Sequence, residues 1–420
     1  MTPSKKANKF KGVGVTDLLI NAGYMLLGPV NEHIPDAAVL ITGDRIVAVG
    51  RREDVETQAT RDHQTLSFPD ATVLPGLIDC HVHLGFDAGS DPVASLRASD
   101  DAKLLDDMAG RARKLLDSGV TTARDLGDRG GLALRLRDEI AAGRQTGPRI
   151  IAAGPPVTSR KGHCWFLGGE VQGEDEIRKA VRHSARQGSD VIKVMATGGG
   201  LTRGGPAIWE PQFTTEELAA AVEEAHRAGL PVAAHAHGTA GIAAVITAGV
   251  DTIEHCTWMT VDGGVDLRED LVAEIVARGI RVCPATHPNW RSFAERVGPE
   301  RAREAFSPAR RMAEQGVRLI AGTDAGIPRS VFGGLASSLE FLEHIGLSKA
   351  EVIASATVEA ADALSLAHDT GRLSPGFRAD LAVVGGNPLD DLKALHDIRL
   401  VVAAGRLHSP EQAHCADAGG

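Results

Sequence analysis

The stretch SDVIKVMATGG, residues 189–199, combines a short β-branched apolar run with one lysine and a glycine-rich end. Seven similar runs occur along the chain, and helical stretches of ten to twenty residues separate them. Such continuous, non-alternating runs are typical of parallel strands buried on both faces. The other runs are ATVLPGLIDCHVHLG (71–85), GVTTARDLG (119–127), PRIIAAGPPVT (148–158), LPVAAHAHG (230–238), GVDTIEHCTW (249–258), IRVCPATHPN (280–289) and VRLIAGTDAG (317–326). Eight strand–helix units over about 300 residues predict an α/β fold with a (β/α)8 TIM barrel.

The stretch TTEELAAAVEEAHRAG, residues 214–229, illustrates the intervening helices. Thr214 and Glu217 have the spacing of a capping box, and apolar residues then recur at steps of three and four. Gly229 marks the end of the pattern. The sequence therefore predicts an amphipathic helix between the fourth and fifth strands.

The two ends of the chain have a different pattern from its centre. Residues 1–71 contain short apolar runs split by Gly, Asn and Asp, and residues 371–408 return to short strands. We predict that both ends together build a small β-sandwich domain beside a barrel of residues 72–370. Residues 409–420 have no pattern and are expected to be a loose tail.

Composition is that of a globular enzyme. The 420 residues are 43% hydrophobic and 24% charged, with a formal net charge of −10 and only 4% aromatic residues. The acidic balance and the absence of a basic block disfavour a nucleic-acid partner. No stretch approaches the ~18 apolar residues of a membrane helix, and the five cysteines form no CxxC pair. We expect a cytoplasmic protein with free thiols and no membrane partner.

Polar side chains gather where the predicted strands end, and in a barrel these ends face a common pocket. They are His81 and His83 on the first strand, His235 and His237 on the fifth, His255 on the sixth and Asp324 on the eighth. A lone histidine in a strand is more often a hydrogen-bonded core residue. Several histidines and a carboxylate at one level of a barrel instead suit Zn²⁺ or a similar divalent ion. The sequence therefore predicts a metal site.

Lys193 is the unusual residue of the fourth strand. A bare ammonium group is costly to bury, and a neighbouring divalent cation makes it costlier. One interpretation is that Lys193 forms an ion pair or extends toward water. The other is that its amine reacts with CO₂ to form a carbamate, an anionic ligand with two oxygens that can bridge two metal ions.

Six motifs carry a resemblance to a known family. They are VLPGLIDCHVH (73–83), DVIKVMATGGG (190–200), VAAHAHG (232–238), DTIEH (251–255), AGTDAG (321–326) and PGFRADLAVV (375–384). In order and spacing they resemble the amidohydrolase superfamily over essentially the whole chain. The runs MATGGG, HAHG and IEH are similar to its prolidase and imidazolonepropionase-related branch. That branch includes Xaa-Pro and Xaa-Arg/Lys dipeptidases and hydrolases of ochratoxin-type amides, phenylureas and thiocarbamates.

The resemblance implies a homo-oligomeric hydrolase with two divalent ions, expected to be Zn²⁺, with Co²⁺ or Mn²⁺ as alternatives. The implied ligands are His81, His83 and Asp324 for the more buried ion, His235 and His255 for the more exposed ion, and carboxylated Lys193 between them. A metal-bridging hydroxide would attack an amide-type carbonyl, and Asp324 would shuttle its proton to the leaving nitrogen. His237 would contact the substrate carbonyl or the oxyanion, or else pack behind the ligands.

Three loop residues are candidates for contact with a small-molecule amide substrate. His163 and His287 either contact the substrate or make ordinary loop hydrogen bonds, and Arg203 either anchors a carboxylate or is an exposed loop arginine. The expected substrate is a dipeptide, an N-acyl amino acid or a related amide, carbamate or urea. A mononuclear deaminase or cyclic-amide hydrolase, similar to imidazolonepropionase, is the alternative enzyme, and a scaffold without activity is the alternative class. A deaminase does not need Lys193, and the intact ligand set argues against a scaffold.

Overall fold

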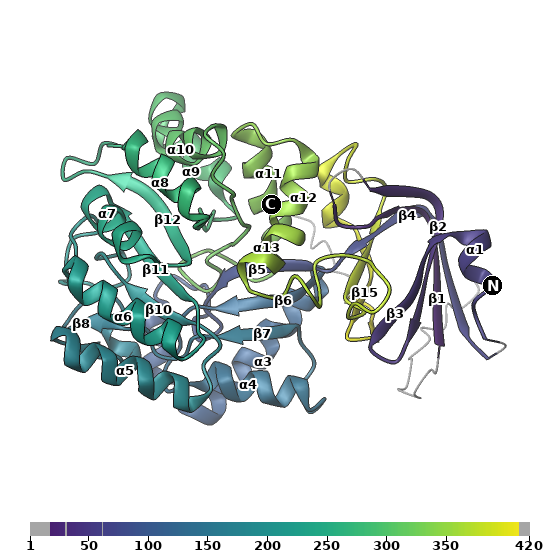
Figure 1. Cartoon of the computed structure of the whole chain (residues 1–420), viewed down its shortest axis with the longest axis horizontal. Helices are drawn as coiled ribbons and strands as arrows, with labels where there is room; N and C mark the ends of the chain where they lie inside the picture. The colour runs from purple at the N-terminus through teal and green to yellow at the C-terminus, as the bar shows by residue number, and fades with distance from the viewer. Residues whose placement is uncertain (1–16, 30–31, 61, 411–420) are drawn as a thin grey trace, which may run out of the picture.

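The computed structural model describes residues 17–29, 32–60 and 62–410. It contains a β-sheet unit at one end and a larger unit of strands surrounded by helices at the other (Figure 1). The sheet has seven strands in the order β16-β15-β14-β4-β1-β2-β3. Their bounds are β1 (Asp17–Leu26), β2 (His33–Thr42), β3 (Arg45–Arg51), β4 (Gln64–Pro75), β14 (Leu381–Gly385), β15 (Ile398–Ala403) and β16 (Arg406–His408). Both chain ends therefore contribute to one sheet, since β4 pairs with β1 and with β14.

The two ends of this sheet share one apolar core. Ile46 of β3 and Val402 of β15 belong to the same buried cluster, although four strands lie between them in the sheet order. The N–H of Ile46 donates to the carbonyl of Phe377 at 2.9 Å, and the N–H of Gly376 donates to the carbonyl of Ile46 at 2.8 Å. The sequence predicts a sandwich; its strands are hydrogen-bonded in one sheet, and the loop before β14 joins β3 across the shared core.

Two parallel sheets form the centre of the larger unit. One is β5 (Leu77–Val82), β6 (Val120–Asp125) and β7 (Arg149–Ala152), and the other is β10 (Ile192–Met195), β11 (Val232–Gly238), β12 (Thr252–Met259) and β13 (Arg281–Cys283). Isolated parallel bridges link them, and these pair Val157 with Val194, Val282 with Leu319, and Val82 with Ala325. The eighth predicted strand, 317–326, contributes such bridges rather than a regular strand.

Helices cover these strands (Figure 1). They are α2 (Pro92–Ala98), α3 (Asp101–Asp117), α4 (Leu132–Ala141), α5 (Gly173–Gln187), α6 (Thr215–Arg227), α7 (Thr239–Ala248), α8 (Glu269–Arg278), α9 (Trp290–Val297), α10 (Pro299–Glu314), α11 (Leu335–His344), α12 (Lys349–Ser355) and α13 (Val358–Ala363). Shorter elements are α1 (Arg52–Glu56), β8 (Thr158–Ser159), β9 (Glu170–Val171), η1 (Trp165–Leu167) and η2 (Leu392–His396). The predicted capping box of α6 is confirmed, because the Thr214 and Glu217 side chains each accept a hydrogen bond from the other residue's backbone N–H. No helix among the described residues is both long and apolar enough to cross a membrane.

Candidate active site

Three predicted ligands meet where β5 lies beside the segment 317–326. Both imidazoles, of His81 and His83, are nearly inaccessible to solvent. Their Nε2 atoms lie 3.3 Å apart, and Asp324 Oδ1 lies 3.5 Å from the first and 3.3 Å from the second. Asp324 Oδ1 is buried and has no hydrogen-bond partner. Three donor atoms thus face one point, as the ligands of a divalent ion do.

Three further histidines lie next to this group. The ligating atoms of His235, His237 and His255 all lie within 4.8 Å of one another. The His237 and His255 rings stack at 4.5 Å between centroids, and His255 also forms a second such group with His81 and Asp324. His255 has a left-handed backbone (φ 68°), and the pairing of β11 with β12 shifts register at this level. The bend brings donors from both strands together, and a β-bulge often aims a side chain in this way.

Lys193 of β10 is buried within the same unit. Its side chain is 2% exposed, and its Nζ atom has no hydrogen-bond partner. Burial lowers the pKa of Lys193, against the opposing effect of the Glu254 and Asp324 carboxylates. Burial raises the pKa of Asp324, but the His81 imidazole and its neighbours lower it to about 2. Lys193 Nζ and Asp324 Oδ1 are thus both buried without a hydrogen-bond partner. Such unpaired polar atoms are costly to bury, and this fits a site whose groups bind a cation.

The imidazoles are suited to ligation because burial keeps them neutral. Burial lowers the pKa of His81 and of His237 to about 4, and that of His163 to about 3. Burial also lowers the pKa of His235 and of His255 well below the ordinary value. A neutral ring retains the lone pair that a metal ion needs, so no proton has to leave these side chains at neutral pH.

The structure identifies buried charges that the sequence analysis did not select. Glu254 accepts hydrogen bonds from His81 Nδ1 at 2.9 Å and from Arg124 at 2.8 Å. Asp79 accepts hydrogen bonds from the backbone N–H groups of His81 and Thr323. A charged residue inside an apolar strand run was the available signal, as it was for Lys193. This signal does not single out Glu254 or Asp79, because the strand sequence does not say which partner a buried charge meets.

The three candidate substrate residues lie in different surroundings. His163 is buried with its ring 4.7 Å from that of His235, so it lines the histidine cluster. Both ring nitrogens of His287 are engaged by backbone groups, of Pro328 and Asn289. Arg203 is 91% exposed and lies 3.6 Å from Asp91, so the structure does not bring it to the histidines.

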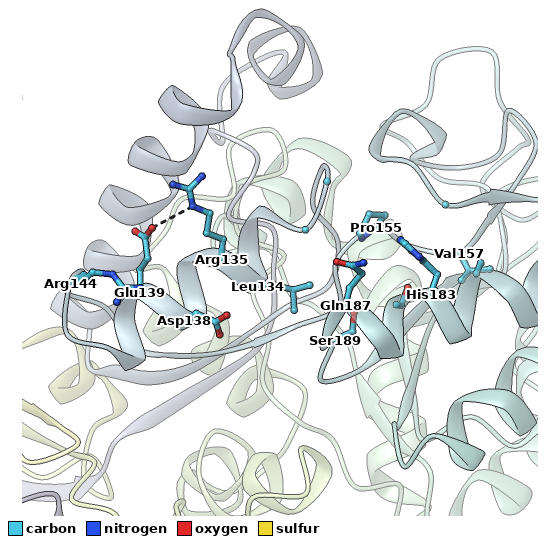
Figure 2. Close-up of a pocket in the computed structure, with 15 residues that line it drawn as sticks. Leu134, Arg135, Asp138, Glu139, Arg144, Pro155, Val157, His183, Gln187 and Ser189 are labelled. Atoms are coloured by element: carbon cyan, nitrogen blue, oxygen red, sulfur yellow. Dashed lines mark ion pairs between the residues drawn. The ribbon is translucent and has the colours of Figure 1, made fainter.

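A separate cavity of about 640 Å³ lies between α4 and α5 (Figure 2). Leu134 and Glu139 of α4 line one side, and His183 and Gln187 of α5 line the other. Arg135 pairs with Glu139 at its edge, at 3.4 Å. The candidate ligands are absent from the lining, so the chemistry belongs to the histidine cluster and not to this cavity.

Comparison with known proteins agrees with the geometry. Residues 72–407 match the model of the amidohydrolase family. The chain is 29% identical to ochratoxinase from Aspergillus niger over 426 residues, covering 91% of this chain and 84% of the relative. It is 27% identical to imidazolonepropionase from Cereibacter sphaeroides over 380 residues, covering 83% and 88%. The crystal structure of a Xaa-Pro dipeptidase with bound methionine matches with a TM-score of 0.81 and 30% identity, covering 94% of this chain and 100% of that one. This chain belongs to the amidohydrolase family and is a hydrolase of amide-type C–N bonds.

Proposed function

We propose that this chain hydrolyses a dipeptide, an N-acyl amino acid or a related small amide, using two divalent metal ions held at the mouth of a closed (β/α)8 barrel. The observation that carries the proposal is the pair of unpartnered buried groups, Lys193 Nζ and Asp324 Oδ1, among histidines whose ligating atoms converge. The similarity to a Xaa-Pro dipeptidase and to ochratoxinase supports this substrate class.

In this proposal Lys193 carries a carbamate. Its lowered pKa favours the neutral amine, whose nitrogen forms a bond to the carbon of CO₂ and releases one proton to solvent. The product is an anion with two oxygens, which removes the cost of an unpaired ammonium beside two cations. His81, His83 and Asp324 would hold the more buried ion, and His235 and His255 the other. Zn²⁺ suits these donors, and Co²⁺ or Mn²⁺ would also fit.

Two side chains have further roles in the proposed hydrolysis, one in proton transfer and one in contact with the substrate carbonyl. Bound divalent ions polarise a carbonyl and lower the pKa of water to near neutrality. Asp324 is ionised at neutral pH, so its carboxylate can accept the proton of the attacking water and pass it to the leaving nitrogen. His237 bonds Thr257 through Nδ1 at 2.9 Å, which leaves Nε2 to contact the substrate carbonyl.

Metal analysis of the purified protein tests the proposal, together with a hydrolysis screen over dipeptides, N-acyl amino acids and aryl amides. We expect two equivalents of metal per chain and a carbamate carbon signal after growth with ¹³C-labelled bicarbonate. One equivalent without a carbamate would instead favour the mononuclear deaminase or cyclic-amide hydrolase. A metal-free protein that is active would refute both.

A further inference from the structure

Glu254 joins a predicted metal ligand to a buried cation. It is fully buried on β12, directly before His255. One carboxylate oxygen, Oε2, accepts a hydrogen bond from His81 Nδ1 at 2.9 Å. The other, Oε1, accepts hydrogen bonds from Arg124 Nη2 at 2.8 Å and from the Thr252 hydroxyl at 2.6 Å. Both oxygens are therefore committed, one to the ligand and one to the supporting groups.

Arg124 ties this carboxylate to the strand that bears His81. Its Nε donates to the carbonyl of Cys80 at 2.7 Å, and its Nη1 donates to the Thr252 hydroxyl at 3.0 Å. The bonds thus run from β5 through β6 to β12 and back to the imidazole of His81. A guanidinium group with several fixed donors holds a carboxylate in one orientation, and it offsets the charge of a carboxylate removed from water.

We propose that Glu254 is the positioning residue for His81, with Arg124 as its support. A hydrogen bond from Nδ1–H to Glu254 keeps the proton on Nδ1, so the lone pair of Nε2 points at His83 Nε2 and Asp324 Oδ1. A carboxylate behind a ligating histidine fixes its tautomer and its ring angle and makes it a better donor. The inference rests on the proposed metal centre. Within that centre, Glu254 affects the binding of the more buried ion, because His81 is a ligand of that ion.

Asp79 provides a matched control for Glu254. It is also a fully buried carboxylate near His81, but its hydrogen bonds end on backbone N–H groups and on the Thr323 hydroxyl rather than on an imidazole ring. A role in folding alone would be shared by both carboxylates. Of these two carboxylates, Glu254 is the one that bonds the His81 ring and can fix its tautomer and angle, whereas Asp79 bonds the backbone of His81.

The experiment compares Glu254→Gln with Asp79→Asn in Zn²⁺ competition against a chromophoric chelator, with thermal unfolding as the check on folding. A glutamine side chain is uncharged and has one acceptor oxygen. That oxygen can accept a hydrogen bond from His81 or from Arg124, but it cannot serve both as the carboxylate does. We expect Glu254→Gln to bind one of its two Zn²⁺ ions about 10–100-fold more weakly and Asp79→Asn to keep the wild-type affinities. Equal affinities in wild type and Glu254→Gln would overturn the inference.

A measurement on the unmodified protein covers the case in which Glu254→Gln does not fold. Side-chain ¹⁵N NMR of labelled histidine should show the His81 proton on Nδ1, and a proton on Nε2 would overturn the assignment. A wild-type chain that binds no Zn²⁺ would reject the proposed function itself. Two tight Zn²⁺ sites that are indifferent to Glu254 would reject only this inference.

Discussion

Gly199 lies so close to His163 that a β-carbon on this glycine would sit 2.4 Å from the imidazole Nε2. The His163 ring in turn packs 4.7 Å from the ring of His235. The glycine-rich loop after β10 therefore sets the position of an imidazole beside a predicted metal ligand. A glycine is needed here for close approach.

Replacement of Gly199 by alanine should move His163 and lower turnover. The new methyl group must displace the ring, since two non-bonded heavy atoms cannot lie 2.4 Å apart. We expect kcat/KM to fall about 10–100-fold, on the scale of a misplacement near the chemistry. Gly200→Ala is the control, because no atom lies within 4 Å of a β-carbon there. Equal losses in the two variants would contradict this role.

Asp324→Asn should retain the fold and lose hydrolysis. The amide has nearly the shape of the carboxylate but cannot accept the proton of the attacking water. We expect kcat to drop by about 10²–10⁴, the usual contribution of a positioned acid–base group. Circular dichroism checks the fold, and steady-state kinetics measures the loss. Unchanged turnover would remove Asp324 from the proton path.

Lys193→Ala should lose bound metal and turnover together. The variant lacks the amine that would form the proposed carbamate, and it leaves a space beside the histidines. Added bicarbonate or a short carboxylic acid should restore part of the activity by supplying two oxygens at that place. Retention of full metal content and rate in the variant would show that the lysine is not a ligand.

Asp369 should stabilise the junction between the sheet unit and the larger unit. Its carboxylate accepts hydrogen bonds from Arg45 of β3 and from Arg149 of β7, each at 2.5 Å. Asp369→Ala leaves the half-buried Arg149 unpaired and should cost about 1–3 kcal/mol of unfolding free energy. Asp44→Ala removes a more exposed partner of the same Arg45 and should cost under about 0.5 kcal/mol. Urea unfolding of both variants distinguishes a junction contact from a surface ion pair.

Asp128 should make the protein less stable as the pH rises. Burial, followed by the charge of Asp125, raises the pKa of Asp128 to about 7. The unfolded chain releases this proton near the ordinary value of about 4, so the native state binds more protons between these values. The contribution of Asp128 to stability therefore falls as the pH rises from about 4 to 7 and stays low above it. Asp128→Asn should gain stability over wild type at pH 8 relative to pH 5 in thermal unfolding. The exposed Asp138→Asn should show no such difference.

Much of the fold and of the candidate site follows from local sequence features. Continuous apolar runs predict buried parallel strands because both faces of such a strand pack against apolar neighbours, so apolar residues need not alternate with polar ones. His81 and His83 could be selected from their spacing, since strand residues two apart share a face. The start of α6 likewise follows from Thr214 and Glu217, which act within one turn.

Long-range contacts govern the rest. Glu254 is identified as the partner of His81 only when β5 and β12 lie side by side, and Arg203 is found exposed only once its loop has a place in the fold. The segment 317–326 contributes bridges in place of a regular strand, which its own apolar pattern does not indicate. Spacing and burial are local properties that amino-acid order encodes directly. The partner of a buried charge depends on chain segments that meet only after folding.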